Sequence, residues 1–573
     1  MITDKIKRAV SDALRTLGVS NPFVELEHPA DFSHGDYSTN AALVYAKAVG
    51  VSPRQLAEQI ATAIQGSTLV LEKGRTFIDK IEVAGPGFIN FYLGKNVFVD
   101  GLKDILSAGE AFGTNKNLKG KKILVEYTDP NPFKEFHIGH LMSNTIGESI
   151  ARLYEYSGAE VKRACYHGDV GLHVANAIWG MLEQRSEFEA VKNLSLSEKV
   201  AFLGRCYALG AKQTEEKIRA DIRTINNKVF RADDKQISDL YDIGCEWSYQ
   251  YFESIYKQLG THFDFFFYEK DTGQIGKGAV EESLSKGVFE KSEGAVVYRG
   301  EKQGLHTRVF INKDGLPTYE AKELGLAKLK YDRYSYDQSL VITGNEVNDY
   351  FKVLLVAMTE VFPKLAEKTR HLSHGMMRLP SGKMSSRTGS VVTAESLLAA
   401  VEAMVHDKLD DRELMDMEKN KIAASVAIGA VKYSILRQAI GGDIIYDFEK
   451  SISFEGDSGP YLMYSYARAC SVLRKAGTPR TKEYSSAVDS VGSFERLIIR
   501  FPEIVARAQA EHAPHHLANY LIVIAAAFNH FYAHFKILDA GKDSDYRILL
   551  TGAFAQAMKN GLYLLGIKAI DRM

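Results

Sequence analysis

The sequence predicts an α/β protein with a doubly wound parallel sheet, a small α+β domain before the sheet and an all-helical domain after it. Strand-like runs alternate with helical segments from Ile123 to about residue 390, which is typical of a parallel sheet covered by helices. The chain before this region combines helices with a pair of strands, and the chain after it has helical spacing alone. The predicted domains are 1–115, 116–390 and 391–573.

Composition limits the class of protein. The chain has 573 residues, 45% hydrophobic and 25% charged, as in an ordinary globular protein of about three or four domains. The formal net charge is −1, so any surface for nucleic acid must be a local basic patch. No apolar run approaches the roughly 20 residues that a membrane helix needs, so we expect no membrane partner. The N-terminus carries an early acid, Asp4, and no signal-like apolar core, so we expect a cytoplasmic protein.

The cysteines give no metal-binding pattern. They are Cys165, Cys206, Cys245 and Cys470. None form a Cys-x-x-Cys pair, so we expect no structural zinc and no other metal held by the protein. Free thiols of this kind are typical of a reducing compartment.

Three helices and a strand hairpin are predicted in the first 115 residues. The first helix has one apolar face, formed by Ile2, Ile6, Val10, Leu14 and Leu17. The next two cover 41–49 and 56–64. Strand-like runs at 78–83 and 88–93 flank a Gly-Pro-Gly turn at 85–87, which suits a hairpin.

The central domain follows a linker rich in glycine, asparagine and lysine at 113–120. Its predicted strands include 123–127, 161–166, 295–298, 308–311 and 339–342. A charged, mostly helical insertion is predicted at about 180–290. In a doubly wound sheet the ligand binds outside the carboxyl ends of the strands, so polar residues after strands are the candidates for a site.

The C-terminal region is predicted to be a helical bundle. The stretch from Leu517 to Phe535 is strongly apolar, with tyrosine, asparagine and histidine between the apolar residues. We predict a buried helix for most of these positions.

A turn with two histidines follows the first strand of the central domain. His137 and His140 flank Gly139, just before an apolar helical spacing. A helix N-terminus presents backbone N–H groups and a positive dipole end to an anion. Imidazoles there can donate hydrogen bonds to phosphate oxygens that gain charge in a transition state. The pattern predicts a phosphate site, and a simple turn with a core histidine is the alternative.

A second segment, from Ser381 to Gly389, is bracketed by glycine, basic and rich in hydroxyl groups. It presents Lys383 and Arg387 as cations for phosphate groups. Taken alone, such a segment is more typical of a solvated loop.

Together and in this order, the two segments resemble the signatures of class I aminoacyl-tRNA synthetases. The first matches residue for residue. The second has the Lys-Met-Ser start but carries Ser386 where many members have a lysine. The flanking motifs resemble the arginyl-tRNA synthetase family, and they are 35–40, 85–90, 125–132, 168–171, 316–319 and 453–461.

The resemblance implies a Rossmann-like catalytic domain and a two-step reaction. A ligase of this family activates L-arginine with ATP, accompanied by Mg²⁺, to arginyl-adenylate and releases pyrophosphate. It then transfers arginine to tRNA(Arg) for translation. We expect activation to require the tRNA, and we expect a monomer rather than a homodimer.

The resemblance also implies which residues bind ATP. The set is Gly139, His137, His140, Gly344, Glu346, Lys383, Met384 and Ser385. Val347, directly after Glu346, departs from the polar residue that is usual in the family. The catalytic residues implied are His137, His140, Lys383 and Lys134. We favour Lys134 over Arg387 to replace the charge that Ser386 removes, a loss of about 2–4 kcal/mol of transition-state stabilisation.

The arginine-binding set implied by the resemblance is Glu126, Asn131, Tyr319, Glu323 and Asp169. Glu126 and Asn131 hold the amino and carboxylate ends of the substrate, and Tyr319 packs along its side chain. Glu323 stands where the family usually has an aspartate for the guanidinium group, and Asp169 is a further acidic candidate.

The outer domains of the family bind tRNA. The resemblance places the tRNA elbow on residues 1–115 and the anticodon on residues 391–573. Phe88 and Asn90 are candidate elbow contacts, because an aromatic ring can stack a base and an amide can read its edge. A core position for Phe88 is the alternative. Tyr520 and Tyr532 are candidates to stack loop bases.

Three other functions stay open at this point. Another class I synthetase is disfavoured by the flanks of the histidine turn and by the missing cysteine–histidine zinc spacing. A catalytically silent tRNA-binding paralogue is kept open by Ser386, Glu323 and Val347, although His137, His140 and Lys383 are intact. A small-molecule nucleotidyltransferase would leave both outer domains without a role.

Overall fold

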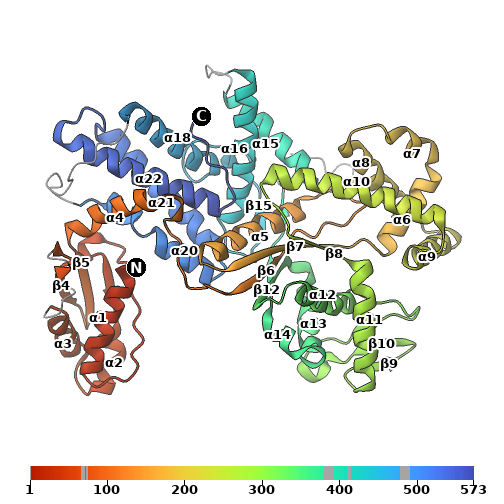
Figure 1. The fold of residues 1–573 in the computed structure, drawn as a ribbon, viewed down its shortest axis with the longest axis horizontal. Helices are drawn as coiled ribbons and strands as arrows, with labels where there is room; N and C mark the ends of the chain where they lie inside the picture. Colours follow the sequence, from red (N-terminus) through yellow and green to blue (C-terminus); the bar gives the residue numbers. More distant parts are fainter. Residues whose placement is uncertain (1, 66–70, 73–74, 380–391, 410–414, 478–490) are drawn as a thin grey trace.

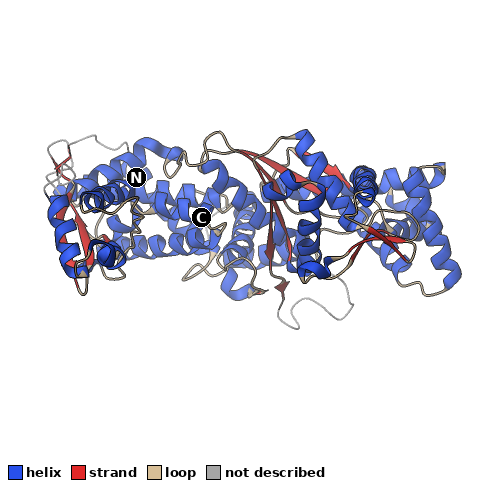
Figure 2. Cartoon of the chain, turned by 90° about the horizontal axis from the view of Figure 1, so that it is seen from below, coloured by secondary structure: helices blue, strands red, loops and turns tan. Residues whose placement is uncertain are grey.

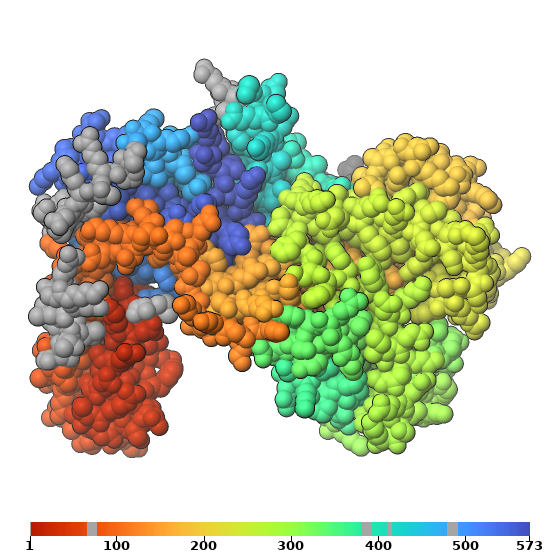
Figure 3. Space-filling model, in the orientation of Figure 1, coloured from red at the N-terminus to blue at the C-terminus, as the bar shows by residue number. Residues whose placement is uncertain are grey.

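The computed structural model describes residues 2–65, 71–72, 75–379, 392–409, 415–477 and 491–573. The N-terminal domain lies at one end of the molecule, the helical domain lies beside it, and the parallel sheet with its insertion follows (Figure 1). Figure 2 shows helices without strands between the N-terminal sheet and the strands of the other half. An open recess separates the N-terminal domain from the domain of the parallel sheet (Figure 3).

The N-terminal domain packs three helices against an antiparallel sheet of order β1-β5-β4. The elements are α1 Ile2–Thr16, β1 Tyr37–Thr39, α2 Ala41–Val49, α3 Pro53–Gln65, β2 Leu71–Glu72, β3 Arg75–Thr76, β4 Ile78–Ala84 and β5 Phe88–Leu93. The three predicted helices and the hairpin at 85–87 are confirmed. The apolar face of α1 is fully buried at Ile6, Val10 and Leu14 because it lies in the core of this domain.

Polar contacts attach this domain to the helical domain. The hydroxyl of Tyr37 donates to the carboxylate of Glu503 at 2.6 Å, and Asp36 forms an ion pair with Arg496. Both pairs are mostly buried, so they are shielded from the solvent screening that weakens exposed pairs.

Five strands form one parallel sheet in the order β13-β12-β6-β7-β8. They are β6 Lys122–Glu126, β7 Glu160–His167, β8 Phe265–Tyr268, β12 Gln338–Gly344 and β13 Thr369–His374. The chain starts in the middle at β6, runs outward through β7 and β8, and then returns to β12 on the other side of β6. The strand order therefore reverses between β6 and β12, which is where a doubly wound sheet opens a ligand crevice.

Two predicted strands belong to a different sheet. β10 Ala295–Tyr298 and β11 Arg308–Ile311 pair antiparallel with each other, and β9 Glu290–Ser292 pairs with β10. Their assignment to the parallel sheet was wrong. The link between β10 and β11 is too short for the crossover of about a dozen residues that parallel strands need.

Helices cover both faces of the parallel sheet and fill the insertion. They are α5 Ile138–Tyr156, α6 Leu172–Glu183, α7 Arg185–Val191, α8 Leu196–Ala211, α9 Glu216–Arg231, α10 Lys235–Leu259, α11 Glu269–Ser285, α12 Tyr319–Arg333, α13 Asn348–Val361 and α14 Pro363–Lys368. The region 180–290 is mostly helical, as predicted, but it also contains β8. This four-residue aromatic strand has no alternation that would distinguish it from a buried helical segment.

In its described residues, the C-terminal domain is helical apart from a short strand. Its elements are α15 Ala394–Leu409, α16 Asp416–Leu436, β15 Ile444–Ile445, α17 Phe448–Ser451, α18 Gly459–Ala476, α19 Ser493–Ile498, α20 Phe501–Ala510, α21 Pro514–His534 and α22 Ser544–Leu564. β15 pairs with β14 Met377–Arg378. α21 confirms the predicted buried helix, with Leu517, Leu521 and Ile524 inaccessible. α4 Lys95–Ala108, inside the first predicted domain, packs on α22.

The described helices include none that is both long and apolar enough to cross a membrane.

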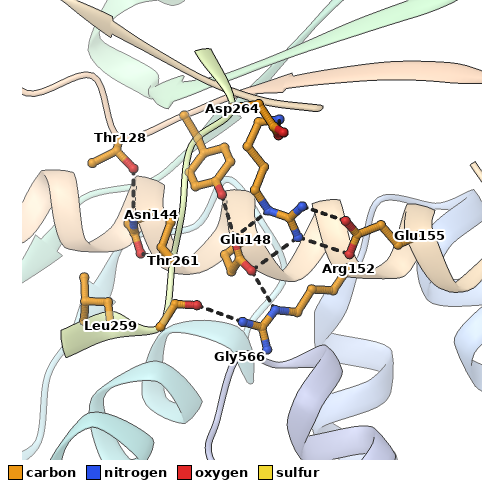
Figure 4. Close-up of polar contacts among 12 residues, drawn as sticks. Thr128, Asn144, Glu148, Arg152, Glu155, Leu259, Thr261, Asp264 and Gly566 are labelled. Carbon is orange, nitrogen blue, oxygen red and sulfur yellow. Dashed lines mark hydrogen bonds and ion pairs between the residues drawn. The ribbon is translucent and has the colours of Figure 1, made fainter. Parts of the chain in front are cut away.

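Glu148 ties α5 to the sheet and to the helical domain (Figure 4). Its carboxylate accepts hydrogen bonds from the Tyr127 hydroxyl at 2.6 Å, from Arg163 of β7 at 2.9 Å and from Arg152 at 2.7 Å. Arg152 also donates to a carbonyl near the end of α22. Gly147 makes the first contact possible, because a Cβ there would lie 2.2 Å from the Tyr127 ring. The helix that begins at the histidine turn is therefore anchored in both domains.

Candidate active site

Because the five strands are parallel, their carboxyl ends meet at one edge. The polar or small residues that end or soon follow strands there include Glu126, Asp169, Glu269 and Gly344. The histidine turn lies at the same edge, since α5 follows β6 and the Ser143 hydroxyl donates to the Ile342 carbonyl of β12 at 3.0 Å. The residues predicted to follow strand ends therefore lie at one edge of the sheet.

His137 caps α5, a role more usual for serine or aspartate. Its Nδ1 accepts hydrogen bonds from the backbone N–H groups of Gly139 at 3.1 Å and His140 at 3.4 Å. The Nδ1 of His140 accepts in turn from the His137 N–H at 3.2 Å. Because a backbone N–H can only donate, each neutral ring carries its proton on Nε2. The turn therefore holds two Nε2–H donors side by side, in rings whose centroids are 3.5 Å apart.

Both imidazoles are neutral at pH 7. Burial, helped by the positive charge of Lys134, lowers the pKa of His137 to about 4. Burial and the neighbouring His137 lower the pKa of His140 well below its usual value. These rings act as hydrogen-bond donors rather than as cations, and the cationic charge at the site must come from lysine or arginine.

Lys134 lies close to both histidines. Its charge lowers the pKa of His137, His140 and His173, in each case after the larger effect of burial. Its ammonium group lies over the ring of Tyr207 in α8, 4.4 Å from the ring centre. The structure thus brings the predicted replacement for the missing lysine charge to the histidine turn.

The predicted residues Lys383, Met384 and Ser385, and the departure at Ser386, lie outside the described residues. The chain that follows them is described and returns to the histidine turn. The backbone N–H of Ile138 donates to the Val392 carbonyl at 3.2 Å.

Gly344 and Glu346 lie at the end of β12. A Cβ at Gly344 would lie 2.1 Å from a carboxylate oxygen of Glu346, so that side chain folds back over the glycine. The negative charge of Glu346 partly opposes the lowering of the His137 pKa by burial. The two predicted ATP contacts therefore lie near the histidine turn, on the other side of the strand-order reversal.

A buried acidic cluster adjoins the turn. Glu126 accepts from the ammonium group of Lys330 at 2.7 Å, and both side chains are almost inaccessible. Burial and the charge of Glu126 raise the pKa of Glu323 to about 8, although Lys330 acts in the opposite direction. Burial and Glu126 also raise the pKa of Asp129 well above its usual value. An added cation would stabilise the ionised forms, so this cluster suits a guanidinium ligand.

The other predicted arginine contacts border this cluster. Tyr319 begins α12 and is 60% exposed. The amide oxygen of Asn131 packs against Gly168, where a Cβ would lie 2.2 Å away. Asp169 is buried and accepts from the Tyr241 hydroxyl at 2.7 Å and from a backbone N–H of α11 at 3.0 Å. Both contacts tie the turn after β7 to the neighbouring helices.

The sequence analysis missed charged residues of the site, among them Glu269, Lys322 and Lys330. Glu269 begins α11 directly after β8, and its carboxylate lies 2.5 Å from the ammonium group of Lys322, with both side chains 6% exposed. Glu126 was predicted from the family resemblance. An acid directly after a strand would have been the local signal for Glu269, but β8 was not predicted. Lys330 lies 204 positions from Glu126 and has no local signal.

The two predicted elbow contacts differ in exposure. Phe88 is partly exposed at the start of β5. Asn90 is buried, and its side-chain oxygen accepts from the Ser38 hydroxyl at 2.7 Å. In this conformation Asn90 links β1 to β5 rather than facing a ligand.

The two predicted anticodon tyrosines also differ. Tyr520 is buried and donates to the Leu497 carbonyl at 2.9 Å, so its ring offers no face to a base in this structure. Tyr532 is 44% exposed. It lines a cavity of about 720 Å³ between α18, α21 and the C-terminus, and its ring centre lies 4.9 Å from the Arg468 guanidinium.

The doubly wound sheet with a histidine turn beside its strand-order reversal defines a class I aminoacyl-tRNA synthetase. The family model for the catalytic domain of class I tRNA synthetases (R) matches residues 101–448. Models for the arginyl tRNA synthetase N-terminal domain and the DALR anticodon binding domain match residues 2–93 and 462–573. The chain belongs to the arginyl-tRNA synthetase family.

The sequences of curated relatives match nearly the whole length of this chain. An arginine–tRNA ligase of Fusobacterium nucleatum is 30% identical, covering 96% of this chain and 95% of the relative. One from Streptococcus agalactiae is 29% identical, covering 100% of this chain and 99% of the relative. The fold matches the arginyl-tRNA synthetase of Thermus thermophilus, with a TM-score of 0.82, 22% identity and full coverage of both chains. It also matches that of Plasmodium falciparum, with a TM-score of 0.79, 20% identity and coverage of 100% and 99%.

Proposed function

We propose that this enzyme activates L-arginine in the acidic cluster and transfers it to tRNA(Arg), with the work divided among the residues described above. A carboxylate oxygen of arginine attacks the α-phosphorus of ATP, and the bond to pyrophosphate breaks. The terminal ribose hydroxyl of the tRNA then attacks the acyl carbon, and AMP leaves. Because the substrate carboxylate is the nucleophile, the protein orients the reactants and neutralises charge. The pair of Nε2–H donors beside the cluster is the observation that carries this proposal.

The phosphate groups of ATP are assigned to the histidine turn. His137 and His140 donate from Nε2 to oxygens that gain charge, and Gly139 leaves room for adenine. Lys134 supplies the cationic charge that Ser386 does not, and Lys383 is assigned to the leaving pyrophosphate. His137, His140, Lys134 and Lys383 are the proposed catalytic residues, because each is assigned to a reacting phosphate group.

Mg²⁺ enters as part of the MgATP substrate. Within the described residues, no group of three or more histidine, cysteine, aspartate or glutamate side chains is placed to hold a metal ion. Phosphate oxygens and water are the ligands that Mg²⁺ ordinarily keeps in such sites.

Arginine is assigned to the acidic cluster. Glu126 holds the α-amino group and Asn131 the carboxylate end, while Tyr319 packs along the side chain. Glu323 receives the guanidinium group, because burial and the charge of Glu126 raise the pKa of its carboxyl and a cation beside it would favour the ionised form. Asp169 contributes to the same negative field.

The outer domains are assigned to tRNA(Arg). Phe88, at the exposed start of β5, is the candidate for the tRNA elbow. Tyr532 stacks a base of the anticodon loop in the cavity that Arg468 also lines. We propose that the enzyme acts as a cytoplasmic monomer and that activation requires the tRNA.

The test is arginine-dependent ATP–pyrophosphate exchange, with and without tRNA(Arg), with lysine and canavanine as controls. We expect exchange with arginine that depends on the tRNA. Tight tRNA binding without exchange for any amino acid would identify a silent paralogue instead. Full exchange without tRNA would contradict the tRNA requirement alone.

A further inference from the structure

A second buried lysine, Lys322, borders the acidic cluster. The Lys322 ammonium group, 2.5 Å from the Glu269 carboxylate, also lies over the ring of Tyr319 at 5.2 Å from its centre. The ring of Phe230, from α9 of the insertion, lies 5.8 Å away. A cation, a carboxylate and two aromatic faces thus form one group, in which the ion pair is almost inaccessible while Tyr319 is 60% exposed.

This group overlaps the site assigned to the arginine side chain. Tyr319 is the residue proposed to pack along that side chain. Burial and the charge of Glu126 raise the pKa of Glu323 most, and the charge of Glu269 raises it further. After burial, the charge of Asp169 in turn raises the pKa of Glu269. The Lys322 ammonium therefore has the partners that a guanidinium would use, a carboxylate and an aromatic face.

Close helix packing holds Lys322 in this place. A Cβ at Gly276 of α11 would lie 1.8 Å from the Ala321 carbonyl oxygen of α12, so only glycine permits the approach. One turn earlier, a Cβ at Gly273 would lie 3.8 Å from the Lys322 side chain. The approach brings Glu269, the first residue of α11, beside the first turn of α12.

We propose that Lys322 is an internal competitor for arginine, which occupies the guanidinium site of the free enzyme and is displaced when arginine binds. The proposal rests on the proposed function, because it takes this cluster as the arginine site. A buried carboxylate without a partner is strongly destabilising, so Lys322 neutralises Glu269 until the substrate guanidinium, bound between Glu323 and Glu269, replaces its charge. A neutral analogue such as citrulline cannot replace that charge. Lys322 is thus a specificity-determining residue that selects for a cationic side chain at the expense of affinity.

The test compares arginine binding by calorimetry in the wild type, in Lys322→Met and in Lys328→Met. Lys328 is the control because it lies on the same helix in a largely exposed pair with Asp332. Lys322→Met is expected to lower the Kd for arginine by about tenfold or more. It is also expected to lower Tm without ligand and to enlarge the rise in Tm that arginine causes. Lys328→Met is expected to match the wild type. An equal or higher Kd in Lys322→Met overturns the proposal.

A second variant and a double variant complete the test. Lys322→Gln keeps a donor for Glu269 without the charge and covers the case in which Lys322→Met does not fold. Its Kd for arginine is expected between those of the wild type and Lys322→Met. In a Glu269→Gln background, Lys322→Met is expected to give no gain in affinity, and a gain of the same size there would overturn the mechanism.

Pyrophosphate exchange by the wild type separates the two proposals. If arginine supports no exchange and binds to no form of the enzyme, the proposed function fails and the role of Lys322 fails with it. If exchange is normal while the Kd for arginine is the same in the wild type and Lys322→Met, only the role of Lys322 is overturned.

Discussion

His137 and His140 cap α5 with one nitrogen of each ring and offer the other to a ligand. Each Nδ1 accepts a backbone N–H of the turn that joins the two residues, which leaves Nε2–H as the free donor. The same contacts that start the helix therefore select the tautomer that phosphate binding needs. A structural role and a chemical role are combined in one turn, and substitutions can separate them.

His137→Asn is expected to keep the cap and lose the donor, because an amide oxygen can accept from the turn where Nδ1 does. Exchange should fall by about 10²–10³-fold, the cost of one transition-state donor, while Tm stays near the wild type. His137→Ala should lose both the cap and the donor, and loss of the cap should lower the free energy of unfolding by about 1 kcal/mol. Near-normal exchange in His137→Asn would show that the Nε2–H is not required.

Lys134→Met is expected to slow adenylate formation by about 10²–10³-fold, since it removes the charge proposed to replace the lysine missing at Ser386. The Kd for arginine should change little, because the acidic cluster is formed by other residues. Single-turnover adenylate formation and arginine binding measure the two effects. Lys134→Arg is the matched control and should retain part of the rate; a normal rate in Lys134→Met would assign the charge to another residue.

Arginine affinity is expected to rise with pH. The Glu323 carboxyl has a pKa raised to about 8 by burial and by Glu126, so it is mostly protonated at neutral pH. A guanidinium favours the ionised form, so binding releases a proton and the Kd for arginine falls as pH rises towards 8. The steepest change in the Kd for arginine that release of one proton can produce is about tenfold per pH unit. Calorimetry between about pH 6.5 and 8.5 measures this slope, and Glu323→Gln should flatten it. A flat wild-type profile would mean that Glu323 does not receive the guanidinium.

Two glycines of α11 should respond in opposite ways to alanine. Gly276→Ala places a methyl group 1.8 Å from the Ala321 carbonyl oxygen and is expected to destabilise the enzyme by about 1–3 kcal/mol or more and to weaken arginine binding. Gly278→Ala meets no atom within 4 Å and is expected to stabilise it by about 0.5–1 kcal/mol. Thermal unfolding with and without arginine distinguishes them. Equal effects would show that the contact of α11 with α12 relaxes freely.

Tyr532→Ala is expected to raise the KM for tRNA(Arg) by about 5–150-fold, as the loss of one stacked base does. Arginine-dependent exchange at saturating tRNA should be unchanged. Tyr520→Phe removes only the buried hydroxyl that donates to the Leu497 carbonyl, so it should lower Tm without a change in KM. The reverse result, with Tyr520 controlling KM, would require the helical domain to rearrange on binding.

Local features of the chain were predicted well because neighbouring residues determine them. The histidine turn, the 85–87 hairpin and the buried α21 each depend on spacing within about 20 residues. The assignment of β10 and β11 to the parallel sheet was wrong, since strand partners are chosen at long range. Because β8 was not predicted, Glu269 was not recognised as a site residue. An acid can be identified as following a strand only when the strand itself is predicted.

The sequence by itself determined the family, the order of the domains and most of the residues placed around the histidine turn. These depend on local spacing and on short motifs that can be recognised in the sequence alone. Only the tertiary structure decided how the charges are paired. Lys322 meets Glu269 across 53 positions and Lys330 meets Glu126 across 204. Such pairs depend on long-range packing. The pair of Lys322 with Glu269 depends on the close contact of α11 with α12 at Gly276, which no local pattern reports. Burial then made these pairs obligatory, since a carboxylate removed from water requires a cation or a proton.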